Sequence, residues 1–320
     1  MRVGKLDNDR LSELILGKFK QTRAEVVGNS GVGDDCAVLD LGSDLVLLSC
    51  DPITAAGLRD LGRLSVYVNC NDAAAAGAEP IGLLVTLLIP PACTEEDVAQ
   101  VADDLASAAA EIGVDILGGH TEVTEVVSRM VTVSTVVARR ARADASAKPK
   151  PGDALVMTKW AGLEGSAILA HDYPHLFDNL AETVLWECES AGQYLSILPE
   201  ARIAARCGAS AMHDVTEGGV LAAAWELAWR EGVGLRMDLD AIPVLGGTRA
   251  VCSKAGLNPL RLIGSGSLLC FCRDADALLA ALRENGIAAA VIGVVTESGF
   301  IDSDGNEISP PGTDEIYSVL

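Results

Sequence analysis

The sequence predicts an α/β protein built of two domains of similar size. Three observations support this prediction. Apolar runs of strand length alternate with helical segments, apolar residues make up 49% of the 320 residues, and the alternation is interrupted once, near residue 150. The length suits about two domains, and the apolar content is enough for a large core. We therefore expect layered α/β or α+β domains over residues 1–150 and 151–320.

The first half is expected to alternate helices with strands. Apolar spacing predicts a helix over 7–19 and an alanine-rich helix over 61–78. A third helix is expected from Thr94, where a capping residue precedes three acidic residues, to Gly113. Strands are expected at 45–50, 81–89, 114–117 and 126–138.

Residues 139–152 break this pattern with five basic residues and two prolines. A solvated inter-domain connection is favoured there over a binding patch. In the second half, a helix over 274–285 is expected to end at Gly286. The other elements expected are strands at 153–158, 234–238, 267–272 and 289–295, and helices at 163–171, 179–197 and 217–231.

Charge and cysteine content exclude several classes of protein. The formal net charge of −21 disfavours a nucleic-acid-binding surface, and an anionic small molecule would need a metal ion to mask its charge. No apolar run is long enough for a membrane span, and residues 1–7 lack the apolar region of a signal peptide. The nine cysteines are scattered without a CxxC pair, which predicts reduced thiols in a cytoplasmic protein.

Aspartates follow or interrupt apolar runs at three places in the first half. Asp34 and Asp35 follow a glycine-rich run, Asp51 follows a predicted strand, and Asp72 lies inside the alanine-rich helix. An unpaired carboxylate is costly inside an apolar helix. Such oxygen-rich sets suit Mg²⁺ with substrate phosphates. The alternatives are a solvated turn, a strand-end turn before Pro52, and an N-cap at Asn71 or Asp72.

Two glycine-containing motifs complete the candidate site. The segment 118–122, Gly-Gly-His-Thr-Glu, follows the strand expected at 114–117, and its glycines allow the backbone to approach a ligand closely. In the second half, Asp214 or Thr216 is expected to cap the helix after Gly218 and Gly219, whose N-terminus is an anion site. The alternative is an ordinary capped helix. No Walker motif is present, so a nucleotide would depend on metal ions and glycine-loop N–H groups.

These motifs, in this order, resemble the superfamily of aminoimidazole ribonucleotide synthetase (PurM), selenophosphate synthetase, thiamine-monophosphate kinase and the hydrogenase maturation protein HypE. The resemblance spans residues 5–300, and HypE-like members look closest in length and in the break near residue 150. It implies a PurM-like fold of two α/β domains, in which the N-terminal domains of a homodimer form a β-barrel-like core.

The resemblance also implies an enzyme that uses ATP with Mg²⁺ to activate an oxygen atom of an acceptor molecule. The metal ligands it implies are Asp34, Asp35, Asp51 and Asp72. His120 and Asp72 are the implied catalytic residues. The implied nucleotide-binding residues are Gly31, Gly33, Asn71, Gly118, Gly119, Thr121, Asp214, Gly218 and Gly219.

Two departures from HypE bear on the acceptor. HypE acts on a thiocarboxamide carried by its own C-terminal cysteine, whereas the last cysteine here is Cys272. HypE sequences tend to read Gly-Asp-Thr-Lys where this one has Gly-His-Thr-Glu at 119–122. We therefore expect an unidentified acceptor, and a partner protein of a maturation complex is one possibility. The alternatives are a small-molecule kinase similar to thiamine-monophosphate kinase and a non-catalytic nucleotide-binding scaffold.

Overall fold

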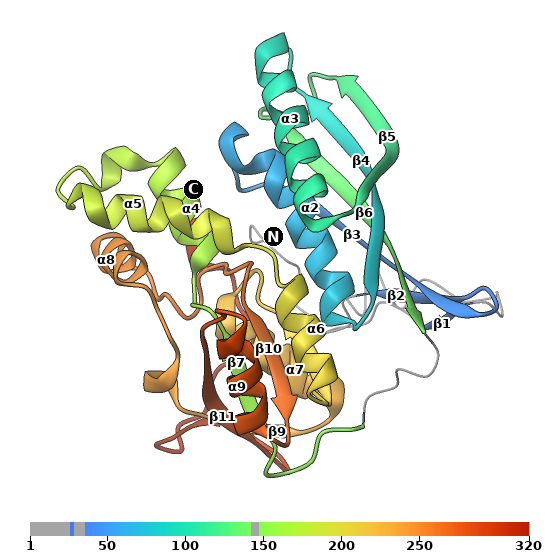
Figure 1. Ribbon diagram of the computed structural model, residues 1–320. Coiled ribbons are helices and arrows are strands. Elements are labelled where there is room, and N and C mark those ends of the chain that lie inside the picture. The colour runs from blue at the N-terminus through green and yellow to red at the C-terminus, as the bar shows by residue number, and fades with distance from the viewer. Residues whose placement is uncertain (1–25, 29–35, 142–146, 320) are drawn as a thin grey trace.

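The computed structural model describes residues 26–28, 36–141 and 147–319, which form two units, each with a six-stranded sheet (Figure 1). The strand order is β1-β2-β3-β6-β4-β5 in the first sheet and β12-β9-β11-β7-β10-β8 in the second. Each sheet contains parallel and antiparallel pairs. The predicted α/β fold class is thus confirmed, whereas the helix expected at 7–19 lies outside the described residues.

The first sheet is covered on one face by two long helices, α2 (Leu58–Ala75) and α3 (Glu95–Ile112) (Figure 1). Its strands are β1 (Val26–Gly28), β2 (Ala37–Asp40), β3 (Asp44–Ile53), β4 (Glu79–Ile89), β5 (Asp115–Val123) and β6 (Val131–Ala141). The capping box predicted for α3 is present: Thr94 and Asp97 satisfy each other's backbone N–H groups, and Gly113 ends the helix at φ +74°. Because α2 begins at Leu58, Asp72 lies inside it, and the N-cap interpretation of Asp72 is wrong.

The strand β5 is longer than the sequence predicted. The glycine pair was expected to follow a strand ending at residue 117, but β5 runs to Val123. Gly118 and Gly119 continue the strand at φ +144° and +145°. A Cβ atom on Gly119 would lie 1.8 Å from the carbonyl oxygen of Val85 on β4, so the close approach of the two strands requires glycine.

The second sheet carries helices on both faces. Its strands are β7 (Ala154–Thr158), β8 (Ala211–Asp214), β9 (Gly234–Met237), β10 (Leu268–Cys272), β11 (Ala289–Thr296) and β12 (Phe300–Asp302). Alternate residues of β10 face opposite sides: Leu269 and Phe271 pack in the core under α7, whereas Cys270 packs in the core that includes α6 and α9. The helices are α4 (Leu163–Asp172), α5 (Glu182–Ala191), α6 (Leu198–Arg206), α7 (Gly219–Glu231), α8 (Gly246–Ala255) and α9 (Ala275–Glu284).

Two helix predictions in the second half need correction. The helix expected at 179–197 is broken: α5 ends at Ala191, a 3₁₀ turn covers Gly192–Tyr194, and α6 then starts with Pro199 in its first turn. The helix α8 was not predicted, because it opens with two glycines, which are poor helix formers. None of the helices in the described ranges is long and apolar enough to cross a bilayer.

Candidate functional site

Asp51 and Asp72 lie at one interface, between β3 and α2. The Ser49 hydroxyl donates to Asp72 Oδ2 at 2.5 Å, and the Asp51 backbone N–H donates to Asn69 Oδ1 at 2.9 Å. Ser49 and Asp51 are two residues apart on β3, and Asn69 and Asp72 are three apart on α2, so each pair shares one face of its element. The structure thus brings together the two predicted metal ligands that it describes.

The remaining predicted metal ligands, Asp34 and Asp35, lie outside the described residues, as do Gly31 and Gly33. Among the residues that are described, no three His, Cys, Asp or Glu side chains form a group that could hold a metal ion. A complete metal site therefore depends on Asp34 and Asp35 joining Asp51 and Asp72, and it stays a prediction.

A cleft of about 900 Å³ runs between the two domains beside this interface. Leu47 on β3 and Ala75 on α2 line one wall, and Met212 on β8 lines the other. Ala75 follows Asp72 by about one helical turn, so the cleft begins next to the carboxylates. A ligand in the cleft could contact both domains.

The cleft carries a group of arginines, which the sequence analysis missed. They come from β6, α6 and α7 and are Arg140, Arg202, Arg206 and Arg230. Arg202 and Arg206 have no hydrogen bond or ion pair with any described residue, so their guanidinium groups can bind an anion. The solvated connection expected at 139–152 is wrong for its first residues, because β6 continues to Ala141 and Arg140 lines the cleft.

Asn71 joins the two domains in this structure. Its side chain is fully buried, its Nδ2 donates to the carbonyl of Leu195 at 2.8 Å, and its Oδ1 accepts the N–H of Ile197 at 2.9 Å. Both polar atoms of the amide are therefore engaged with the loop before α6. This linkage explains an asparagine in the middle of a buried helix without a nucleotide.

His120 and Thr121 lie on β5, at the edge of the first sheet, where every residue of the strand is exposed. His120 Nε2 lies 3.5 Å from the Glu122 carboxylate, and both side chains are more than half exposed. Two strands, β6 and β4, separate β5 from β3, so the strand axes are about 14 Å apart. Within one chain, the structure does not bring His120 next to Asp51 and Asp72.

The segment 214–219 packs around the start of α7. Asp214 ends β8 with 1% of its surface exposed, and its Oδ2 has no hydrogen-bond partner among the described residues. The expected cap from Asp214 or Thr216 is wrong: Gly218 is the N-cap, and its N–H donates to Asp314 Oδ2 at 2.5 Å. A carboxylate of the chain itself thus lies at the anion site that was predicted there. A Cβ on Gly219 would lie 2.6 Å from the carbonyl oxygen of Leu260.

Glu164, fully buried in the first turn of α4, is expected to lower the stability of the fold as the pH rises. Burial is the largest cause that raises its pKa from 4.5 to about 7, and the charges of Asp314 and Asp60 act in the same direction. The folded state therefore binds this proton more tightly than the unfolded state does. Its contribution to stability is present below pH 4.5 and is lost as the pH rises towards about 7.

Glu164→Gln is accordingly expected to raise the free energy of unfolding by about 3 kcal/mol at pH 8 and to change it little at pH 4. Urea unfolding at the two pH values measures the difference. Glu284→Gln, an exposed substitution on α9, is the control and is expected to have no effect at either pH. An equal effect of Glu164→Gln at both pH values would contradict the assignment.

The fold and the site together agree with one protein family. Residues 33–139 match the model of AIR synthase related protein, N-terminal domain, and residues 150–304 match the model of the C-terminal domain. The two matches fall on the two sheets in turn. The chain belongs to the AIR synthase related proteins, which confirms the resemblance seen in the sequence.

Curated relatives narrow the comparison within this family. Carbamoyl dehydratase HypE of Cupriavidus necator is 35% identical over 212 residues, which cover 63% of this chain and 58% of that protein. A putative hydrogenase expression/formation protein of Methanocaldococcus jannaschii is 28% identical over 309 residues, covering 92% of this chain and 89% of that protein. The match thus spans less than two thirds of the length of the HypE relative.

Solved structures agree with the fold over nearly the whole chain. The complex of AaThiL with AMPPCP and TMP has a TM-score of 0.76 at 20% identity and covers 98% of both chains. HypE in its complex with HypF has a TM-score of 0.74 at 22% identity, covering 94% of this chain and 99% of that one. HypE in complex with ATP has a TM-score of 0.71 at 22% identity, with coverage of 99% and 98%. At these identities the likeness is one of fold.

Proposed function

We propose that this protein is an ATP- and Mg²⁺-dependent enzyme of the HypE type, which activates an oxygen atom of an acceptor molecule. The observation that carries the proposal is the position of the Asp51–Asp72 interface at the mouth of the arginine-lined cleft. Carboxylates suit a hard metal ion, and arginines suit phosphate oxygens. The HypE relatives, and the HypE and AaThiL structures solved with ATP or AMPPCP, support the same conclusion.

The residues present fit Mg²⁺ and a nucleotide. Asp51 and Asp72, joined by Asp34 and Asp35 from the preceding segment, would hold the metal through carboxylate oxygens. When bound, the metal would offset phosphate charge. The cleft arginines would offset more of it, so metal ions are not the sole means by which this acidic chain can bind a triphosphate.

Other side chains of the site would orient these groups. The Ser49 hydroxyl fixes one oxygen of Asp72, and the buried Asp214 presents Oδ2 from the other domain. His120 would act as a hydrogen-bond donor or in proton transfer at the nucleotide or the acceptor. Because β5 is remote from this interface, His120 would serve the site of a second copy in a homodimer. Leu84, Ile116 and Leu117 of β4 and β5, each more than 40% exposed, give that copy an apolar surface to cover.

The acceptor distinguishes the proposed activity from its rivals. A HypE-type reaction releases phosphate and yields a dehydrated acceptor, which a partner protein of a maturation complex could carry; HypE itself has been crystallised with HypF. A kinase of the thiamine-monophosphate kinase type instead yields a stable phosphorylated product, and AaThiL is the neighbour that favours this alternative. A scaffold would bind ATP without turnover. Product analysis by mass spectrometry separates the three.

Arg206→Ala provides the direct test of the cleft. The loss of one charge-assisted contact is expected to weaken ATP binding about tenfold, measured by calorimetry with Mg²⁺. Arg283→Ala on α9, which lies outside the cleft, is the matched control and is expected to bind ATP normally. Affinity unchanged by Arg206→Ala and by removal of Mg²⁺ with a chelator would overturn the proposed site.

A further inference from the structure

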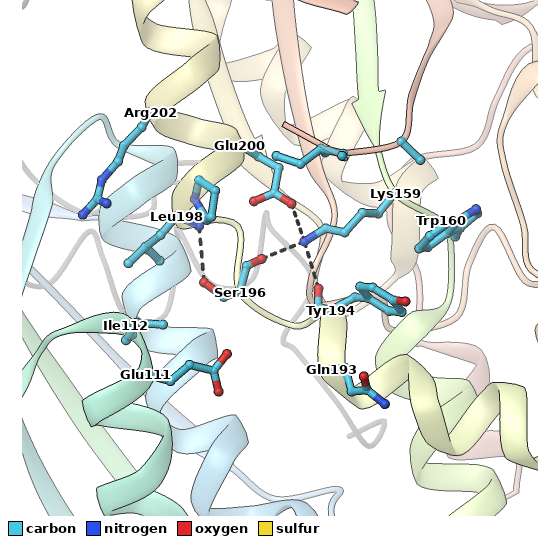
Figure 2. Close-up of a pocket in the computed structure, with 14 residues that line it drawn as sticks. Glu111, Ile112, Lys159, Trp160, Gln193, Tyr194, Ser196, Leu198, Glu200 and Arg202 are labelled. Carbon is cyan, nitrogen blue, oxygen red and sulfur yellow. Dashed lines mark hydrogen bonds and ion pairs between the residues drawn. The ribbon is translucent and has the colours of Figure 1, made fainter. Parts of the chain in front are cut away.

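A second cavity, of about 350 Å³, lies between α3, α6 and the segment that follows β7 (Figure 2). Its walls come from both domains, with Glu111 and Ile112 from α3 and the rest from the second unit. Among the described residues it shares only Arg202 with the arginine-lined cleft. Nothing in the proposed function uses this pocket.

The pocket is built around a buried lysine in an unusual conformation. Lys159 has φ +55° and is the one non-glycine residue with positive φ in the described part of the chain. Its Nζ donates to the carbonyls of Tyr194 and Ser196 at 2.9 and 2.7 Å and contacts Glu200 Oε1 at 2.7 Å (Figure 2). All three N–H donors of the ammonium are therefore used, and backbone strain of this kind is concentrated at functional sites.

Glu200 is left with one oxygen to offer. The residue is 3% exposed, and while Oε1 pairs with Lys159, Oε2 is buried with no hydrogen-bond partner among the described residues. A buried acceptor without a donor is costly, so a donor is expected from a molecule in the pocket. One water molecule could donate, but the cavity has about ten times the volume of a water.

The remaining walls define the shape and charge of such a molecule. Trp160 and Tyr194 pack edge to face at the pocket, with ring centroids 5.3 Å apart, and offer aromatic surface to a flat ring. Because Lys159 and Glu200 cancel each other's charge, the buried end favours a neutral donor. A carboxylate there would be repelled by Glu200 and would supply no N–H group.

We propose that this pocket binds a small neutral aromatic molecule, which donates an amino or carboxamide N–H to Glu200 Oε2 while its ring packs against Trp160 and Tyr194. Such a ligand would bridge the two domains between α3 and α6. This inference is independent of the nucleotide site.

Nicotinamide and nicotinate make a matched pair of probes, since they differ only in the group presented to Glu200. The protein labelled with 5-fluorotryptophan has four tryptophans to follow by ¹⁹F NMR, and Trp160→Phe assigns the signal of interest. Nicotinamide is expected to shift the Trp160 signal saturably and to leave the other three in place. Nicotinate is expected to bind at least about tenfold more weakly.

Variants locate the site without disturbing the buried ion pair. Tyr194→Ala removes one aromatic wall but keeps the carbonyl that Lys159 binds, and it is expected to weaken nicotinamide binding about fivefold. Trp229→Phe, on the exposed face of α7, is expected to leave binding unchanged. Equal affinity for the two probes, or an unmoved Trp160 signal at millimolar nicotinamide, would overturn the proposal.

Discussion

Replacing Asp72 by asparagine is expected to lower Mg²⁺-dependent ATP turnover about a thousandfold while the fold survives. The side chain is buried at the β3–α2 interface and accepts the Ser49 hydroxyl. Asparagine has the same shape, and its amide oxygen can accept the same hydrogen bond, so packing is kept. The variant loses the negative charge that the proposed metal ligand needs. Steady-state turnover across a Mg²⁺ titration measures the effect.

Two further variants define what the loss at Asp72 means. Asp103→Asn, on the exposed face of α3, removes an equal charge away from the site and is expected to leave turnover unchanged. Ser49→Ala keeps the carboxylate but removes its orienting donor, so a loss of about tenfold is expected. Normal turnover in a folded Asp72→Asn protein would eliminate Asp72 as a metal ligand.

Lys159→Met is expected to lower the free energy of unfolding by about 4 kcal/mol, which is a large part of the stability of an ordinary domain. Methionine fills similar space but leaves Glu200 as an unpaired buried charge and removes the donor from two backbone carbonyls. Urea unfolding at pH 7 gives the difference directly. The exposed substitution Lys254→Met on α8 is the matched control and is expected to stay within about 0.5 kcal/mol of the parent protein.

The double variant Lys159→Met/Glu200→Met tests the electrostatic part of that loss. Removing both charges avoids the unpaired carboxylate, so about 2 kcal/mol is expected to return relative to Lys159→Met. The rest is not recovered, because the carbonyls of Tyr194 and Ser196 still lack their donor. A double variant no more stable than Lys159→Met would show that packing rather than charge controls the site.

Local signals in the sequence predicted the fold class and part of the site. The capping box of Thr94 and the glycine at 113 fixed both ends of α3, because these signals act within a few residues. Asp72 was singled out because a carboxylate inside an apolar helix needs a partner, and Ser49 supplies a hydrogen bond. The same local pattern did not reveal that partner, which lies on another element.

Features that depend on long-range contacts could not be predicted. The four arginines of the cleft are far apart in the sequence and meet only when β6, α6 and α7 pack together. The cap of α7 comes from Asp314, near the other end of the chain, so the nearby Asp214 and Thr216 misled the prediction. Gly118 and Gly119 indicated a loop, but the shape of β4 beside them makes them part of a strand.

The loop at 194–197 has a mechanical consequence for the molecule. Asn71 grips it from the first domain, and Lys159 grips it from the second. A hinge rotation of one domain against the other would have to break buried hydrogen bonds on one side of this loop. Substrate entry is therefore expected to involve side-chain rearrangement at the cleft rather than rigid-body opening of the two halves.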